Sequence, residues 1–260
     1  MRAAEYAFFD APFLAFAHRG GAAYAPNLGR ENTLHAFSTA VALGYRYLET
    51  DVHATADGNL LAFHDPLLDR VTNGFGAVAE RTALELAEIR IGGQDPIPTF
   101  AELLEAFPAA RFNVDAKADA AVDLLAEVIG EHDAYERVCV GSFSAARLHR
   151  LRRRLGARVP TAVSARGVVL HRFAPWVTRV LDSPAPALQI PVSTRVGGRS
   201  VRITTPGLVR AAHRRGKQVH VWTVDDRASI ERLLDLGVDG IFTDRPDTLK
   251  DVLLEHGLWS

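Results

Sequence analysis

The chain has 260 residues, a net charge of −1 and a pI near 6.8, and 48% of its residues are apolar. A chain without net positive charge lacks the basic surface typical of nucleic-acid-binding proteins, so no nucleic-acid partner is expected. No run of about 18 apolar residues occurs, which argues against a spanning helix and stable membrane insertion. The first twelve residues do not resemble a signal peptide, and the single cysteine, Cys139, cannot form an internal disulfide. We therefore expect a soluble, cytoplasmic protein.

Apolar runs rich in β-branched residues alternate along the chain with segments of helical periodicity. These runs predict eight strands, at residues 13–18, 46–52, 111–117, 137–142, 159–164, 187–192, 217–223 and 239–243. Three of the intervening helices have recognisable signals at both ends. The pairs of residues that mark their starts and ends are Asn32 and Gly44, which flank a helix over 33–43, Thr99 and Pro108, and Asp226 and Gly237. Eight strand–helix units in about 250 residues predict one α/β domain over residues 1–260, a closed (β/α)8 TIM barrel.

Two stretches depart from this alternation. Residues 54–98 contain one further short strand, at 60–64, and short helices around 80–90. We expect this segment to be a small insertion after the second strand rather than a second domain. Residues 193–200 are predicted as a glycine-containing loop, and the sequence does not decide whether it is a lid or an interface.

The one basic cluster contains six arginines between Arg147 and Arg158. Leu148, Leu151 and Leu155 recur among them at helical spacing, which predicts that the arginines form the solvated face of an amphipathic helix. Contact with an anionic membrane surface is the alternative.

Polar side chains interrupt the predicted strands near their carboxyl ends, where the active sites of barrel enzymes lie. His18 ends the first strand and Arg19 follows it, where a histidine can transfer protons and an arginine can bind an anionic oxygen. His64 ends the additional strand and supplies a second titratable ring. An isolated histidine at such a position more often only caps a strand, so the pair matters more than either residue.

Carboxylates recur with a period of two on two further strands. Glu49 and Asp51 share one face of the second strand, because side chains alternate along it. Two such acids at a barrel mouth repel each other unless a cation lies between them, and their oxygens suit Mg²⁺, Ca²⁺ or Mn²⁺. Solvated acids at an exposed strand end are the alternative. On the third strand, Asp115 adds a carboxylate and Lys117 a cation, although a buried ion pair explains these two residues equally well. Together these groups meet the acid–base and charge requirements of phosphodiester cleavage.

Seven motifs occur in order over nearly the whole chain. They are His18-Arg19-Gly20, Glu31-Asn32-Thr33, Glu49-Thr50-Asp51-Val52, His64-Asp65, Asn113-Val114-Asp115-Ala116-Lys117, Val221-Trp222-Thr223 and the run from Gly237 to Pro246. In order and spacing the chain resembles the bacterial type of the glycerophosphodiester phosphodiesterase family. A single one of these motifs is weak support, whereas seven in order are specific.

The resemblance implies a metal-dependent hydrolase that converts a small glycerophosphodiester into glycerol 3-phosphate and an alcohol. It implies attack by the substrate's own 2-hydroxyl to give a cyclic phosphate, which water then opens. The implied roles are His18 and His64 as catalytic acid and base, Glu49, Asp51 and Asp115 as ligands of a divalent cation such as Mg²⁺ or Ca²⁺, Arg19 and Lys117 as phosphate-binding residues, Trp222 on the headgroup side, and Glu31 as a supporting acid. The headgroup and the oligomeric state stay open.

The chain departs from the family pattern at two places. Asp115 is one methylene shorter than the glutamate more often found there, and Pro26–Arg30 lengthens the gap before Glu31 at the edge of the expected site.

Two other functions stay open. One is lysophospholipase D-type hydrolysis of monoacyl phospholipids, with an apolar trough formed by Phe173, Pro175, Trp176, Val177, Pro184 and Pro186. The other is a catalytically silent barrel that serves as a binding module.

Overall fold

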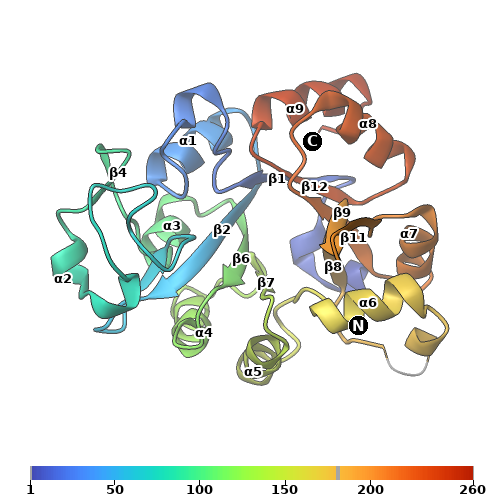
Figure 1. The fold of residues 1–260 in the computed structure, drawn as a ribbon, viewed down its shortest axis with the longest axis horizontal. Helices are drawn as coiled ribbons and strands as arrows, with labels where there is room; N and C mark the ends of the chain where they lie inside the picture. The colour runs from blue at the N-terminus through green and yellow to red at the C-terminus, as the bar shows by residue number, and fades with distance from the viewer. Residues whose placement is uncertain (1, 180–181, 260) are drawn as a thin grey trace.

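The computed structural model describes residues 2–179 and 182–259. At its centre, seven strands pair in parallel in the order β7-β6-β2-β1-β12-β11-β8, and the sheet curls around an interior (Figure 1). These strands are β1 (Leu14–His18), β2 (Tyr47–Ala54), β6 (Arg111–Ala116), β7 (Val138–Gly141), β8 (Ala187–Pro191), β11 (Gln218–Trp222) and β12 (Gly240–Thr243). The first strand lies between β2 and β12, so the two halves of the chain meet there.

The segment between β7 and β8 closes the sheet into a barrel. Thr161 forms a parallel bridge to β7, and Ala162 forms one to β8. The Ala162 amide donates to the Val140 carbonyl at 2.9 Å. The strand predicted at 159–164 is therefore reduced to two single bridges, because Pro160 has no amide hydrogen with which to extend the ladder. The predicted (β/α)8 arrangement is confirmed, with these bridges in place of one strand.

Helices lie outside the barrel (Figure 1). They are α1 (Leu34–Ala42), α3 (Phe100–Ala106), α4 (Ala121–Glu131), α5 (Ala145–Leu155), α6 (Ala165–Phe173), α7 (Pro206–His213), α8 (Arg227–Asp235) and α9 (Pro246–Glu255). The capping box at Thr99 and the cap at Asp226 are confirmed. The cap of α1 is Thr33, whose Oγ1 accepts a hydrogen bond from the Ala36 amide at 3.1 Å. None of the helices described is long and apolar enough to cross a bilayer.

Apolar side chains form two layers. One fills the space between the sheet and the helices, and the other fills the barrel interior. In the interior, Phe16 and Phe242 stack with ring centroids 4.2 Å apart. Phe8 and Phe9, from the short helix η2 (Ala7–Phe9) that follows η1 (Ala3–Glu5), belong to the same cluster. The N-terminal segment thus covers one end of the interior and leaves the opposite mouth for polar side chains.

His220 of β11 lies in this apolar interior and is fully buried. Its ring centroid is 5.3 Å from that of Phe16, and its Nε2 lies 2.9 Å from the Gln218 Oε1. Burial lowers the pKa of His220 to about 3. The ring is therefore neutral in the folded protein at pH values where it is charged in the unfolded chain.

This difference predicts acid sensitivity. As the pH falls from about 6.5 toward 3, the unfolded chain binds a proton that the folded chain excludes, which costs up to about 1.4 kcal/mol of stability per pH unit. We expect His220→Gln to flatten the loss of unfolding free energy between about pH 7 and pH 5, measured by urea denaturation. Parallel curves for the two proteins would contradict this role of His220.

Residues 54–98 form the predicted insertion, to the left of the barrel in Figure 1. Its elements are β3 (Leu60–Ala62), η4 (Val78–Glu80), α2 (Ala83–Leu86), β4 (Arg90–Ile91) and β5 (Asp95–Pro96). Strand β3 pairs antiparallel with β2. A small separate apolar cluster holds the segment together; its members are Leu61, Phe63, Leu68, Val78, Leu86 and Ile91. The extra strand and the short helices predicted here are confirmed.

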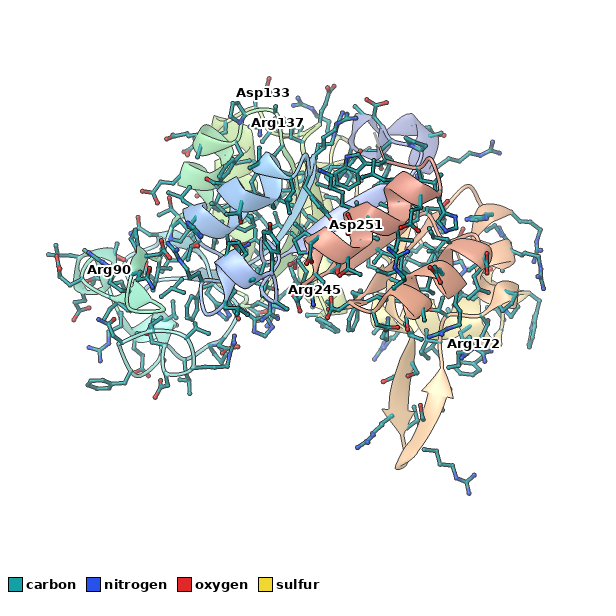
Figure 2. The ribbon with its side chains drawn as sticks, turned by 90° about the horizontal axis from the view of Figure 1, so that it is seen from above. Arg90, Asp133, Arg137, Arg172, Arg245 and Asp251 are labelled. Atoms are coloured by element: carbon teal, nitrogen blue, oxygen red, sulfur yellow. The ribbon has the colours of Figure 1, made fainter. Side chains whose placement is uncertain are left out.

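The loop predicted at 193–200 is instead part of an antiparallel hairpin, β9 (Ser193–Val196) and β10 (Arg199–Arg202). Gly197 and Gly198 form its two-residue turn with φ values of +55° and +78°, which favour glycine. A Gly-Gly pair between two short polar–apolar segments is a hairpin signal, so the prediction of a loop was wrong. Figure 2 shows the hairpin projecting from the body of the protein.

Candidate active site

Parallel register brings the predicted polar side chains together at the carboxyl ends of the strands. His18 of β1 is the register partner of Glu49 on β2, and Asp51 is the partner of Asp115 on β6. These side chains line a cavity of about 410 Å³. The cavity is also lined by the other residues predicted for catalysis, metal or substrate, which are Arg19, His64, Lys117 and Trp222.

A left-handed turn carries the chain from β1 into the site. Arg19 has a φ of +51° and Gly20 one of +84°. A Cβ on Gly20 would lie 2.7 Å from the Cβ of Ala36, so only glycine fits this position. The Asn32 amide donates to the Arg19 carbonyl at 3.0 Å and thereby ties the Glu-Asn-Thr motif to the same turn.

Both histidines are held through Nδ1 by a carboxylate. The His18 Nδ1 lies 2.7 Å from the Asp244 Oδ1, and the His64 Nδ1 lies 2.5 Å from the Asp65 Oδ1. Asp244 is itself fixed, because its amide donates to the Asp225 Oδ1 at 2.7 Å. These contacts orient the two rings and leave the Nε2 atom of each for other partners.

Strand β2 positions His64 from the insertion. The Phe63 amide donates to the Asp51 carbonyl at 2.9 Å, and the His53 Nε2 lies 3.0 Å from the His64 carbonyl oxygen. His53, which shares the β2 face with the two acids in sequence, therefore contacts the backbone behind His64. Its ring is not among the side chains that line the cavity.

Burial and neighbouring charges shift the pKa values of His18 and Glu49. Burial lowers the pKa of His18, but Glu49 and Asp244 raise it by more, so the value lies above 6.5. Burial, followed by repulsion from Asp51, raises the pKa of Glu49 to about 7. The Glu49 Oε2 accepts a hydrogen bond from the Arg19 amide at 3.1 Å and lies 3.8 Å from the His18 Nε2.

Lys117 lies between the two facing aspartates. Its Nζ is 2.8 Å from the Asp51 Oδ1 and 2.7 Å from the Asp115 Oδ2. Burial lowers the pKa of Lys117, but the two carboxylates raise it by more, which keeps the ammonium charged. The ion pair that the sequence offered as an alternative for Asp115 and Lys117 is present.

The carboxylates still have donor atoms that fit an oxygen-preferring cation. The Asp51 Oδ2 and Asp115 Oδ1 are buried and accept no hydrogen bond. The Arg19 Nε lies 3.4 Å from the Asp51 Oδ2. Unpaired buried carboxylate oxygens are costly, and Mg²⁺ or Ca²⁺ would satisfy them. Within residues 2–179 and 182–259, however, no three His, Cys, Asp or Glu side chains converge as a complete metal site, and Lys117 contacts two of these acids.

Glu31 does not line the cavity but links the barrel to the insertion. Its Oε1 accepts hydrogen bonds from the Arg19 Nη1 at 3.0 Å and from the Arg70 Nη2 at 2.7 Å. Arg70 also donates to Glu31 Oε2 at 2.9 Å and to the Asp65 Oδ2. Burial raises the pKa of Glu31, but the two arginines lower it by more. Glu31 therefore connects Arg19 of the barrel with Arg70 of the insertion.

The opposite wall of the cavity is apolar. Its members include Phe143, Val168, Val169, Ile190, Ile203 and Trp222. The Phe143 and Trp222 rings meet edge to face with centroids 5.9 Å apart. None of the residues expected to form an apolar trough lines the cavity, and neither does the segment Pro26–Arg30. The apolar wall comes instead from β8, β11, α6, the loop before α5 and Ile203 after β10.

Sequence reasoning assigned no role to three polar residues of the site. Asp244 follows β12 and Asp65 follows His64, so the strand-end rule that selected the other residues applies to both. Arg70 lies in an irregular segment of the insertion, and only the folded structure brings it to Glu31. The position of a polar residue at a strand end could therefore have identified Asp244 and Asp65, whereas no sequence signal pointed to Arg70.

Comparison with known proteins agrees with this geometry. The model of the glycerophosphoryl diester phosphodiesterase family matches residues 18–248. The chain is 39% identical to a Mycobacterium tuberculosis protein named probable glycerophosphodiester phosphodiesterase 2, over 95% of this chain and 92% of that protein. It is 31% identical to the glycerophosphodiester phosphodiesterase of Caldanaerobacter subterraneus, over 94% and 99%.

A solved structure shares the fold. An Oleispira antarctica phosphodiesterase in complex with the product sn-glycerol-3-phosphate superposes with a TM-score of 0.79 at 24% identity, over 95% of this chain and 99% of that one. The family match extends from the His18-Arg19-Gly20 motif to the start of α9 and includes the whole candidate site. The chain belongs to the glycerophosphoryl diester phosphodiesterase family.

Proposed function

We propose that the protein hydrolyses glycerophosphodiesters to glycerol 3-phosphate and an alcohol in a reaction that depends on a divalent cation. The observation that carries this proposal is the presence in one cavity of two histidines, His18 and His64, each oriented through Nδ1 by a carboxylate. One Nε2 accepts the proton of the attacking hydroxyl, and the other donates a proton to the oxygen of the leaving alcohol. The rings exchange these roles when water completes the hydrolysis.

Arg19 and Lys117 supply the positive charge for the phosphate. Both line the cavity beside the histidines. A guanidinium can bind two phosphate oxygens at once, and an ammonium acts as a point charge, so the pair both orients the diester and stabilises its negative charge. Trp222, with Phe143 at its edge, flanks the side on which the headgroup would lie.

Glu49, Asp51 and Asp115 are the residues that would hold the cation. The unpaired oxygens of Asp51 and Asp115 support this assignment, as does the high pKa that Glu49 has beside Asp51. A bound Mg²⁺ or Ca²⁺ supplies charge neutralisation at the phosphate oxygens. Lys117 binds two of the same acids, so it has to share them with the cation.

The apolar wall favours lysophospholipase D-type activity as a second candidate, because an acyl chain would find aliphatic side chains there. Release of glycerol 3-phosphate or its monoacyl counterpart can be compared between glycerophosphocholine and monoacyl glycerophosphocholine. The proposed function predicts a higher kcat/KM for the deacylated substrate. A higher value for the monoacyl lipid would reverse the order of the two candidates, and turnover of neither would favour a silent barrel.

Arg70 is expected to act as a positioning residue through Asp65 and Glu31. Arg70→Ala should lower kcat by about ten-fold to a hundred-fold with a smaller change in KM, because the His64 ring loses its fixed orientation. Arg81→Ala, in the same insertion but over the Phe75 ring, is the matched control and should leave kcat unchanged. Equal kcat values for Arg70→Ala and the wild-type enzyme in steady-state assays would show that Arg70 does not position His64 for the reaction.

A further inference from the structure

The rim of the active-site mouth carries large apolar side chains that face solvent. Phe143 and Val169 both line the cavity, yet they are 68% and 55% exposed. Further along α6, Phe173 is 50% exposed, and Val196 near the tip of the hairpin is 60% exposed. Exposed apolar side chains gathered around a cavity mouth are typical of surfaces that contact another apolar phase or partner.

The arginines of α6 and of the β9–β10 hairpin, two elements that contribute residues to the cavity lining, have no acidic partners among the described residues. Residues 161–205 contain six arginines against one aspartate, Asp182, in a chain whose net charge is −1. Asp182 already lies 3.3 Å from the His171 Nε2 and 3.4 Å from the Lys217 Nζ. None of the arginines that the structure describes in this stretch forms an ion pair. They are Arg166, Arg172, Arg195, Arg199 and Arg202.

The basic cluster between Arg147 and Arg158 differs in this respect. Arg150 lies 2.9 Å from Asp123, and Arg154 lies 3.2 Å from the same residue. Arg147 and Arg158 have acidic partners as well. The basic cluster noticed in the sequence is therefore largely paired with acids of the same protein, whereas the arginines around the mouth are available to external anions.

The hairpin carries three of these arginines, Arg195, Arg199 and Arg202, and projects from the body of the protein (Figure 2). Thr194 of β9 lines the cavity, so the hairpin forms part of its edge. At its base, the Arg172 Nε donates to the Arg202 carbonyl at 3.0 Å, which ties the hairpin to α6. The cross-strand pair of Val196 and Arg199 places an apolar and a cationic side chain together next to the turn.

We propose that α6 and the β9–β10 hairpin form a docking face that seats the active-site mouth on an anionic phospholipid bilayer. Aliphatic and aromatic side chains gain by entering the acyl boundary, while guanidinium groups bind lipid phosphates in the headgroup layer. A nucleic acid would match the arginines but leave the exposed valine and phenylalanine side chains without partners, so the lipid surface fits both features. Binding of this kind is peripheral, reversible and sensitive to salt.

Membrane docking itself is independent of catalysis. That docking brings lipid-derived substrates to the active-site mouth rests on the proposed function. The test is co-sedimentation of the full chain with phosphatidylcholine vesicles, with and without phosphatidylserine in a seven-to-three ratio, at low and high salt. We expect binding only with phosphatidylserine at low salt. The double variant Arg195→Ser/Arg199→Ser should lower the partition constant about thirty-fold. The matched control Arg150→Ser/Arg154→Ser removes the same charge from α5 and should bind as the wild type does.

Three outcomes would overturn the proposal. They are no binding of the wild-type protein to phosphatidylserine vesicles, an equal loss in the α5 control, and variant-sensitive binding to heparin or an acidic polypeptide without binding to vesicles. Turnover of soluble glycerophosphocholine by the same proteins separates the two claims. We expect the hairpin variant to keep wild-type turnover, because neither Arg195 nor Arg199 lines the cavity. If the proteins bind vesicles but neither the wild type nor any variant turns over glycerophosphocholine, the proposed function would be overturned and the docking proposal would stand.

Discussion

Replacing His18 with alanine is expected to lower the turnover of glycerophosphocholine by roughly two to four orders of magnitude, the usual contribution of a positioned acid or base. The substitution removes the ring that Asp244 orients at the cavity floor. His64→Ala should have an effect of the same size, because Asp65 orients that ring in the same way. Initial rates at saturating substrate measure both effects.

The control for these variants is His35→Ala. His35 contacts the Pro26 carbonyl on the surface of α1 and does not line the cavity. Its loss should leave turnover close to the wild-type value, and circular dichroism should show that all three variants stay folded. Near-normal turnover in either His18→Ala or His64→Ala would contradict the assignment of the acid–base pair.

Glu49→Gln is expected to have the second large effect, a loss of at least about a hundred-fold in cation-supported activity. The amide keeps the shape of the side chain but removes the charge that a cation needs. It should also stabilise the metal-free protein. Because burial and Asp51 raise the pKa of Glu49 from 4.5 to about 7, the folded protein loses stability as the pH rises from about 4.5 through 7. Removal of this group should therefore contribute on the order of 2 kcal/mol at pH 8.

Thermal unfolding gives a readout of this prediction that does not depend on activity. Without metal at about pH 8, the variant should melt at a higher temperature than the wild-type protein. Added Mg²⁺ or Ca²⁺ should raise the melting temperature of the wild type more than that of the variant, because a bound ligand stabilises only the form that binds it. Identical metal titrations for the two proteins would remove Glu49 from the cation site.

The barrel could be predicted because each central strand is an apolar run separated from the next by a helical pattern. The run at 159–164 looks the same in composition, but Pro160 limits it to two bridges, which the hydrophobic pattern does not reveal. The hairpin turn at Gly197 and Gly198 was a readable signal. Local composition thus identified the elements, whereas the backbone hydrogen bonds determined which of them became strands.

The site could be predicted to a similar extent. Glu49 and Asp51 were identifiable because acids rarely interrupt an apolar strand without a partner. Their distances to other groups were not, since register and side-chain rotamers depend on the whole fold. The sequence left open whether Lys117 pairs with Asp115 or binds a ligand, and the structure shows contacts to both Asp51 and Asp115. Arg70 needed a contact across 39 positions of sequence.

The activity that we propose for the protein is the cation-dependent hydrolysis of a glycerophosphodiester. The most direct measurement is ³¹P NMR of the purified protein with glycerophosphocholine, first after chelation and then with Mg²⁺ or Ca²⁺ restored. We expect the diester resonance to persist in the chelated sample and to be replaced by that of glycerol 3-phosphate once the cation returns. A diester resonance that persists with both cations, or that disappears equally fast in the chelated sample, would contradict the proposed activity.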